Sequence, residues 1–140
     1  MHPFYDKANA LAAEVFDAVI EVRKQFGSGV MLEKVYQKCL ARELELRGHE
    51  VQLEAEVPIE YKGYVFEEKL RMDILVDKTL VVECKAVDPD KVNVDRFRAQ
   101  ALTYLRLMNL PLALVVNFGV DQVGKKGISR VILKGASNPE

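Results

Sequence analysis

The hydrophobic period of this sequence changes at Glu50, and the change divides the chain into a helical part and a mostly extended part. Before Glu50, apolar residues recur every three or four positions, which predicts helices over about residues 4–25 and 30–47. A glycine-rich break at 27–29 separates these two helices. After Glu50, apolar and polar residues alternate over 51–56, which is typical of an antiparallel strand with one wet face.

The rest of the chain continues this extended pattern and adds one more helix. Further strands are expected at 57–61 and 64–67, with a Lys62-Gly63 turn between them, and more apolar strands at 72–76 and 80–87 are expected at the centre of the sheet. A helix over 93–108 precedes a buried strand at 112–118, so this strand is expected to run parallel to a neighbour. Gly124 to Gly127 reads as a turn, and 128–133 as an edge strand. The prediction is a single α/β domain over residues 1–134, with a central mixed sheet flanked by helices, and a flexible tail over 135–140.

Composition narrows the classes of function. The chain has 140 residues and a net charge of -1, so it has no global basic field that would attract nucleic acid, and any such partner must meet a local patch. The cysteines, Cys39 and Cys84, lack partners at zinc-ligand spacing. No apolar stretch approaches the length of a membrane span, and the N-terminus lacks a basic segment followed by an apolar one. A cytoplasmic protein that does not bind membranes is therefore expected.

Two charged residues interrupt the apolar strand at 80–87. Glu83 and Lys85 are two positions apart, so they share one face of the strand with Val81. One interpretation is an ion pair, or exposure of both groups on a wet face. The other is a functional site, because burying either charge alone is costly.

Asp73 on the preceding strand favours the functional site. A three-residue loop over 77–79 would place Asp73 directly opposite Glu83, so that two carboxylates and the Lys85 ammonium converge. A two-residue loop would instead place Asp73 opposite Val82 and break the arrangement. Opposed carboxylates need neutralisation, and Mg²⁺ is typically held by one or two carboxylates together with substrate phosphate.

These residues resemble the Asp…(Asp/Glu)-x-Lys signature of the PD-(D/E)XK nucleases, here Asp73 followed by Glu83-Cys84-Lys85. Gln100 and Tyr104, on the next helix, resemble the Gln-x-x-x-Tyr pair found in some members of that superfamily. The resemblance implies a restriction-endonuclease-like core. The chain also resembles the small prokaryotic family named after Gly-x-x-Glu-x-x-Tyr, and this likeness spans about residues 20–120.

Several segments carry the second resemblance. They are Gly29 to Tyr36, Val57 to Gly63, Glu83 to Val87, Ala99-Gln100 and Val116 to Gly119. Two positions depart from the family pattern. Gly29 stands four residues before Glu33 instead of three, and Phe97 occupies a position where many family members have histidine.

The resemblance implies a Mg²⁺ or Mn²⁺ ion held by Asp73, Glu83 and the backbone carbonyl of Cys84, with help from Glu33. It implies that Lys85 orients the attacking water or stabilises charge on the phosphate, with Gln100 in support. Contacts with the nucleic acid are expected from four further residues, namely Lys91, Arg96, Arg98 and Tyr104. The plainer interpretations are a surface glutamate favoured by a helix N-terminus for Glu33, and a solvated basic helix face for the cations.

Three functions follow as alternatives. The first is a metal-dependent phosphodiesterase acting on DNA or, second in order, on RNA, for which a homodimer would suit paired cuts. The second is a nucleic-acid-binding module that keeps the fold without catalysis. The third is a protein-interaction domain in which the charged triad is a structural cluster. Fold alone does not decide among them.

Overall fold

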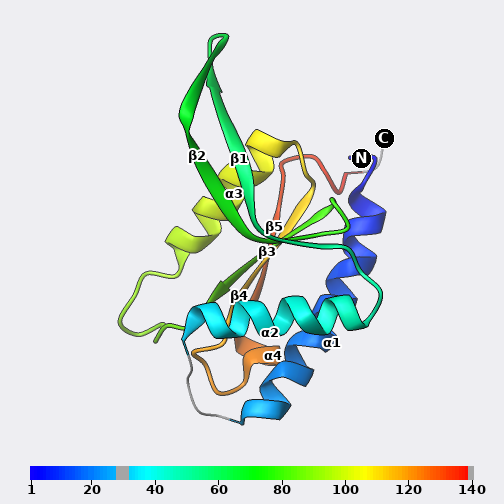
Figure 1. The fold of residues 1–140 in the computed structure, drawn as a ribbon, viewed down its shortest axis with the longest axis vertical. Coiled ribbons are helices and arrows are strands. Elements are labelled where there is room, and N and C mark those ends of the chain that lie inside the picture. The colour runs from blue at the N-terminus through cyan, green and yellow to red at the C-terminus, as the bar shows by residue number, and fades with distance from the viewer. Residues whose placement is uncertain (28–31, 139–140) are drawn as a thin grey trace.

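The computed structural model describes residues 1–27 and 32–138, which form a five-stranded sheet with helices on both faces (Figure 1). The helices are α1 (Tyr5–Phe26), α2 (Glu33–Leu46), α3 (Asp95–Met108) and the single turn α4 (Val123–Lys126). The strands are β1 (Val51–Tyr61), β2 (Tyr64–Val76), β3 (Leu80–Lys85), β4 (Leu112–Asn117) and β5 (Ile128–Ile132), and they lie in that order across the sheet. Only the β3–β4 pair is parallel among the strands described. The predicted α/β fold with a central mixed sheet is confirmed.

The strand predicted at 80–87 ends two residues early because the side chain of Asn117 takes over its hydrogen bonding. Asn117 Oδ1 accepts the N–H of Val87 at 3.0 Å, and Asn117 Nδ2 donates to the Val87 carbonyl at 3.0 Å. The amide thus imitates a strand neighbour at the point where β3 ends. After Val87 the chain continues into the connection that leads to α3.

Other predicted boundaries also move. The two strands expected at 64–67 and 72–76 form one strand, β2, because β1 pairs with both parts of it. The turn expected at Gly124 to Gly127 is the short helix α4. The helix expected over 30–47 is described from Glu33, and the motif residue Gly29 lies outside the described residues.

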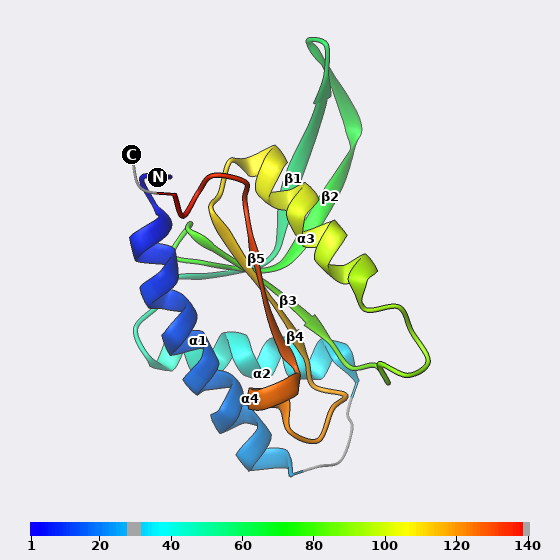
Figure 2. The same ribbon diagram turned by 180° about the vertical axis from the view of Figure 1, so that it is seen from behind.

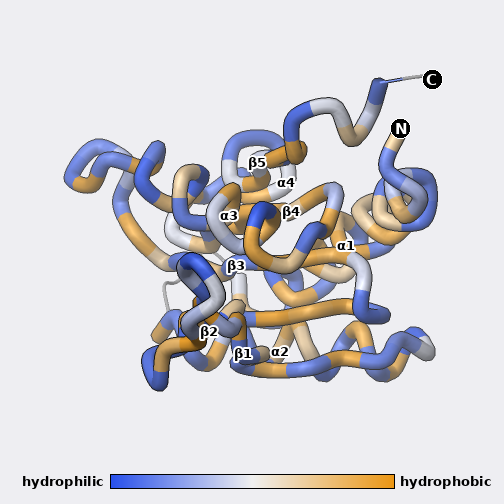
Figure 3. The backbone as a smooth tube through the Cα atoms, turned by 90° about the horizontal axis from the view of Figure 1, so that it is seen from above, coloured by the Kyte–Doolittle hydropathy of each residue, from blue (hydrophilic) through white to orange (hydrophobic). Residues whose placement is uncertain are grey.

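The core has two halves, one on each face of the sheet. On one face, Leu80, Val82 and Cys84 of β3 pack with apolar residues of α1 and α2. On the other, Val81 packs with apolar residues of α3, including Tyr104. Hydrophobic segments gather in the central strands and in the inward sides of the helices (Figure 3). Alternation along β3 therefore directs the odd-numbered residues, and with them the two charged ones, to the face that α3 partly covers.

Phe118 anchors the helical layer to the end of β4. It is fully buried, and its ring stacks on that of Tyr36 of α2, with ring centroids 4.4 Å apart. We expect Phe118→Ala to lower the free energy of unfolding by about 3–5 kcal/mol in a urea titration, because it leaves a cavity among packed side chains. The control, Phe26→Ala at a 45% exposed position, is expected to cost less than about 1 kcal/mol. Equal costs for the two variants would contradict this account of the core.

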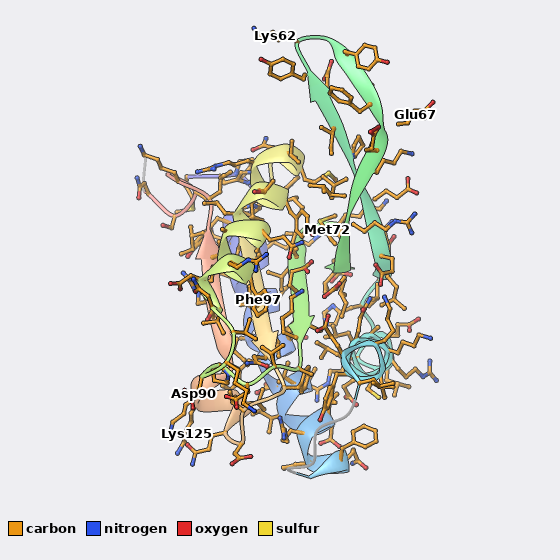
Figure 4. The ribbon with its side chains drawn as sticks, turned by 90° about the vertical axis from the view of Figure 1, so that its left-hand side faces the viewer. Lys62, Glu67, Met72, Asp90, Phe97 and Lys125 are labelled. Carbon is orange, nitrogen blue, oxygen red and sulfur yellow. The ribbon has the colours of Figure 1, made fainter. Side chains whose placement is uncertain are left out.

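The distal part of the β1–β2 hairpin forms an arm that stands clear of the body (Figures 1 and 4). The turn at its tip is Lys62-Gly63, and positive φ angles of 49° and 85° fit the two-residue hairpin turn that matches strand twist. Tyr61 and Tyr64 flank this turn and are 63% and 66% exposed. Met72, at the root of the arm, is fully buried. Asp73 therefore lies where the arm leaves the body.

The N-terminal segment and the last described residues of the chain lie close together (Figure 2). The N–H of His2 donates to the carbonyl of Ala136 at 2.9 Å, and Ala136 is buried. The described part of the tail, as far as Asn138, turns back onto the N-terminal segment. The flexibility predicted for residues 135–140 stays a prediction. None of the helices in the described part of the chain is long and apolar enough to cross a membrane.

Candidate functional site

The loop between β2 and β3 decides which residue lies opposite Glu83. It contains three residues, 77–79, and the first two adopt positive φ angles of 49° and 55°. Val76 then pairs with Leu80, and the pairing continues for two more positions. The next step along this register brings Asp73 opposite Glu83, as the odd-numbered loop predicts.

The carboxylates of Asp73 and Glu83 each accept a backbone N–H from the opposite strand. The N–H of Asp73 donates to Glu83 Oε1 at 2.9 Å, and the N–H of Cys84 donates to Asp73 Oδ2 at 2.8 Å. Backbone pairing of β2 with β3 gives way at this point, because β2 continues into the arm beside β1 while β3 ends at Lys85. The two carboxylates accept backbone N–H groups in place of strand carbonyls, and they lie where β2 and β3 diverge.

Burial makes the Glu83 carboxylate costly to ionise. The residue is only 2% exposed. Burial first, and the negative charge of Asp73 second, raise the pKa of Glu83 to about 8, while the N–H of Asp73 and the charge of Lys85 oppose the shift. At neutral pH the carboxyl group is therefore largely protonated when nothing else neutralises the pair. A cation between the two groups would relieve the mutual repulsion of the carboxylates.

The donor set fits a hard divalent cation. In proteins Mg²⁺ typically binds one or two carboxylates and completes its coordination shell with water and phosphate oxygens. The two adjacent carboxylates of Asp73 and Glu83 match this preference. Within residues 1–27 and 32–138, no group of three or more His, Cys, Asp or Glu side chains is arranged to hold a metal. The thiol of Cys84 is fully buried and its pKa is raised well above the usual value, so a part for this residue is confined to its backbone carbonyl. The candidate site thus offers two carboxylates and not a full set of protein ligands.

Lys85 lies beside the pair on the same face. Its side chain is 16% exposed, and its Nζ lies 3.9 Å from Glu33 Oε1 of α2. The same Nζ lies over the ring of Phe97, 4.9 Å from the ring centroid. Glu33 therefore faces the site from α2, but the partner that the structure shows for it is Lys85. The predicted metal role of Glu33 stays a prediction.

A buried polar link behind the site was missed in the sequence. Gln37 of α2 is 3% exposed, and its Nε2 donates to the Asp73 carbonyl at 2.9 Å and to Glu54 Oε1 at 3.1 Å. Glu54 of β1 also bonds to Lys34, and that ammonium lowers the pKa of Glu54. The available signal was a glutamine in line with the apolar stripe of the helix, one residue after Tyr36. Gln37 thus links α2 to the backbone of Asp73, one of the two carboxylate residues of the site.

We expect Gln37→Leu to weaken the site without removing any charged group. Loss of a buried donor to two acceptors is expected to cost about 1–3 kcal/mol in urea unfolding, and the loosened Asp73 to lower activity about 10- to 100-fold. The control is Gln25→Leu at an exposed position of α1, where the side chain bonds only locally to Glu21 at 2.9 Å in the contacts described. This control is expected to leave activity unchanged. Wild-type activity in a folded Gln37→Leu variant would contradict the role given to Gln37.

The predicted residues of α3 and of the segment before it separate into different places. Gln100 is exposed and lines a hollow of about 330 Å³ with Arg96 and Phe97, and Phe97 points toward β3 (Figure 4). Arg98 lines a second cavity of about 170 Å³, which Phe97 also borders. Lys91 is exposed in the turn before α3. Phe97 thus borders both hollows, with Arg96 and Gln100 on one and Arg98 on the other, whereas Lys91 lines neither of them.

Tyr104 is in the core. It is 2% exposed, and burial, followed by the charge of Glu83, raises its pKa to about 12. This burial leaves the side chain no surface on which to contact nucleic acid, so the role predicted for Tyr104 is not retained. Its position behind Glu83 makes it part of the apolar surroundings that raise the pKa of that carboxyl group.

Comparison with known proteins identifies a family for most of the chain. The family model described as PD-(D/E)XK nuclease superfamily matches residues 9–131, which include Asp73, Glu83, Lys85 and all of α3. Searches of curated proteins and of solved structures found no match.

Proposed function

Because the chain belongs to the PD-(D/E)XK nuclease superfamily, whose members generally use divalent metal ions and act on nucleic acid, we propose that it is a metal-dependent phosphodiesterase that hydrolyses nucleic acid, with DNA as the first candidate. The observation that carries the proposal is the interlocked pair of Asp73 and Glu83, with the Lys85 ammonium on the same face. A buried carboxyl group with a pKa near 8 beside a second carboxylate is a costly arrangement in a purely structural role.

Each residue has a part in the proposed reaction. Asp73 and Glu83 would hold Mg²⁺ or Mn²⁺, and the backbone carbonyl of Cys84 would be a third protein ligand. When bound, such an ion polarises the scissile phosphate and lowers the pKa of a bound water. Lys85 would orient the attacking water or stabilise the negative charge that develops on the phosphate oxygens. Arg96 and Gln100, on the neighbouring helix, contact the substrate backbone or support the site.

Membership of the Gly-x-x-Glu-x-x-Tyr family is a further part of the proposal. It is supported by Glu33, which faces Lys85, and by Tyr36, which is buried against Phe118. The glycine of the signature, Gly29, lies outside the described residues. A homodimer and a cytoplasmic location belong to the proposal as well.

The exposed arm favours a second candidate function, a binding module on the same fold. Tyr61 and Tyr64 at its tip offer aromatic surface to a partner, while the net charge of -1 gives no general attraction for nucleic acid. A module of this kind would bind its partner equally well after loss of the Asp73 charge.

Cleavage of labelled substrates tests the proposal and separates it from the second candidate. Single-stranded, double-stranded and branched DNA, and RNA, are incubated with the protein in Mg²⁺, Mn²⁺ or EDTA, beside Asp73→Asn and Lys85→Ala. The proposal predicts cleavage that requires metal and disappears in both variants. Binding without cleavage, unaffected by Asp73→Asn, would instead select the binding module.

A further inference from the structure

We propose that Phe97 is the positioning residue for Lys85, and that the face of its ring holds the ammonium where it acts on the water or phosphate. This inference rests on the proposed function, since it assigns the means by which that site is kept in order. Phe97 itself touches neither metal nor reacting atoms in the proposed mechanism.

The geometry is that of a cation on an aromatic face. Lys85 Nζ lies 4.9 Å from the centroid of the Phe97 ring, within the range of about 6 Å in which the ring quadrupole attracts a cation. The Lys85 side chain is 16% exposed, so water screens this attraction only partly. The ring is itself held, because Phe97 lies in the first turn of α3 and packs against the apolar cluster under that helix.

The other neighbour of the ammonium on this side holds it less firmly. Glu33 Oε1 is 3.9 Å from Lys85 Nζ, which is beyond hydrogen-bonding distance, and the Glu33 side chain is 44% exposed. At this separation, and with Glu33 open to water, the ion pair holds the ammonium only weakly. A lysine side chain has four rotatable bonds and needs a fixed partner if it is to stay in one place.

An aromatic ring suits this task better than a second carboxylate would. It attracts the ammonium without bringing a negative charge that would neutralise it. It also accepts no conventional hydrogen bond, so N–H donors of Lys85 stay available to a water or a phosphate oxygen. Phe97 thus fixes the position of the charge and leaves its strength intact.

The consequence is a kinetic effect of defined size. We expect Phe97→Leu, which keeps an apolar side chain but removes the ring, to lower kcat roughly 3- to 30-fold with KM nearly unchanged. Phe97→Tyr, which keeps the aromatic face, is expected to retain most of the wild-type kcat. A side chain that served only as packing would respond to volume and not to aromaticity.

A fluorination series separates these two roles. Phe97 is replaced by phenylalanine carrying one, two or three ring fluorines, which keep the shape but weaken the negative face of the ring. The inference expects kcat to fall stepwise along the series, and it expects no change when the same residues replace Phe16, which is 39% exposed on α1. An unchanged kcat in the trifluoro protein would overturn the inference.

A second measurement works without any activity. In the metal-free protein the ε-methylene protons of Lys85 are expected to show an upfield NMR shift from the ring current, lost in Phe97→Leu and kept in Phe97→Tyr. An active enzyme without this shift would overturn the inference about Phe97 and leave the proposed function standing. A wild-type protein that cleaves nothing would overturn the proposed function, and the role of Phe97 with it, even where the shift is present.

Discussion

Glu83→Gln is expected to abolish cleavage while making the metal-free protein more stable at alkaline pH. The amide keeps the shape of the side chain, and its oxygen still accepts the Asp73 N–H that Glu83 Oε1 accepts at 2.9 Å. It removes one of the two negative charges that hold the cation, so we expect activity to fall on the order of 10³-fold or more. The measurement is the initial rate of cleavage in Mn²⁺ at pH 8.

The gain in stability follows from the raised pKa. Between the ordinary carboxyl value of 4.5 and the folded value of about 8, native Glu83 keeps a proton that the unfolded chain has lost. Stability of the wild-type protein in EDTA therefore falls as pH rises through this window, by up to about 3–5 kcal/mol. Glu83→Gln does not carry this cost, so its urea midpoint should exceed that of the wild type at pH 8.5 and match it near pH 4.5. A variant less stable than the wild type at pH 8.5 would contradict the burial argument.

Metal affinity is expected to rise steeply with pH up to about 8. The cation and the proton compete for the Glu83 carboxylate, whose pKa is raised to about 8. Well below that value the apparent affinity for Mg²⁺ or Mn²⁺ should fall about tenfold per pH unit, and the fall between pH 8 and pH 6 should be about 50-fold. At pH 7 each bound ion should release close to one proton.

Calorimetric titration in buffers of different ionisation enthalpy measures both the affinity and the protons released. Glu83→Gln is the matched control, since its residual affinity should change little between pH 6 and pH 8. A wild-type affinity that is flat over this range would show that Glu83 is not a ligand, or that it is ionised before the metal arrives.

The register of the site could be predicted from the sequence because it depends on local rules. An odd-numbered loop between two apolar strands places Asp73 opposite Glu83, and strand alternation places Lys85 on the same face as Glu83. The mixed sheet followed in the same way from the order of periodicities, in which a helix before the strand at 112–118 indicated a parallel neighbour. These relations need only spacing along the chain.

The partners of the site residues could not be predicted because they come from distant elements. Gln37 reaches the Asp73 carbonyl, and Phe97 reaches Lys85, only after α2 and α3 have packed onto the sheet. The long arm could not be predicted for a different reason. The charged run in the middle of β2 reads as a break between strands, whereas pairing with β1 carries the strand through it.

Tyr104 shows a limit of reading a motif without its packing. Helical spacing places it on the same side of α3 as Gln100, yet Tyr104 is buried and Gln100 is exposed. A difference of one turn therefore separates a core residue from a surface residue on this helix. The residues of α3 left for nucleic acid are those at the exposed end, near Arg96.

Binding of Mn²⁺ is the most direct test of the claim that Asp73 and Glu83 form a metal centre. Free and bound Mn²⁺ are counted by electron paramagnetic resonance at pH 8, with wild-type protein and with Asp73→Asn, whose amide oxygen can still accept the Cys84 N–H that Asp73 Oδ2 accepts at 2.8 Å. The account predicts saturable binding by the wild type that Asp73→Asn largely removes while the variant stays folded. Wild-type protein that binds no Mn²⁺, or binding that Asp73→Asn leaves unchanged, would contradict it.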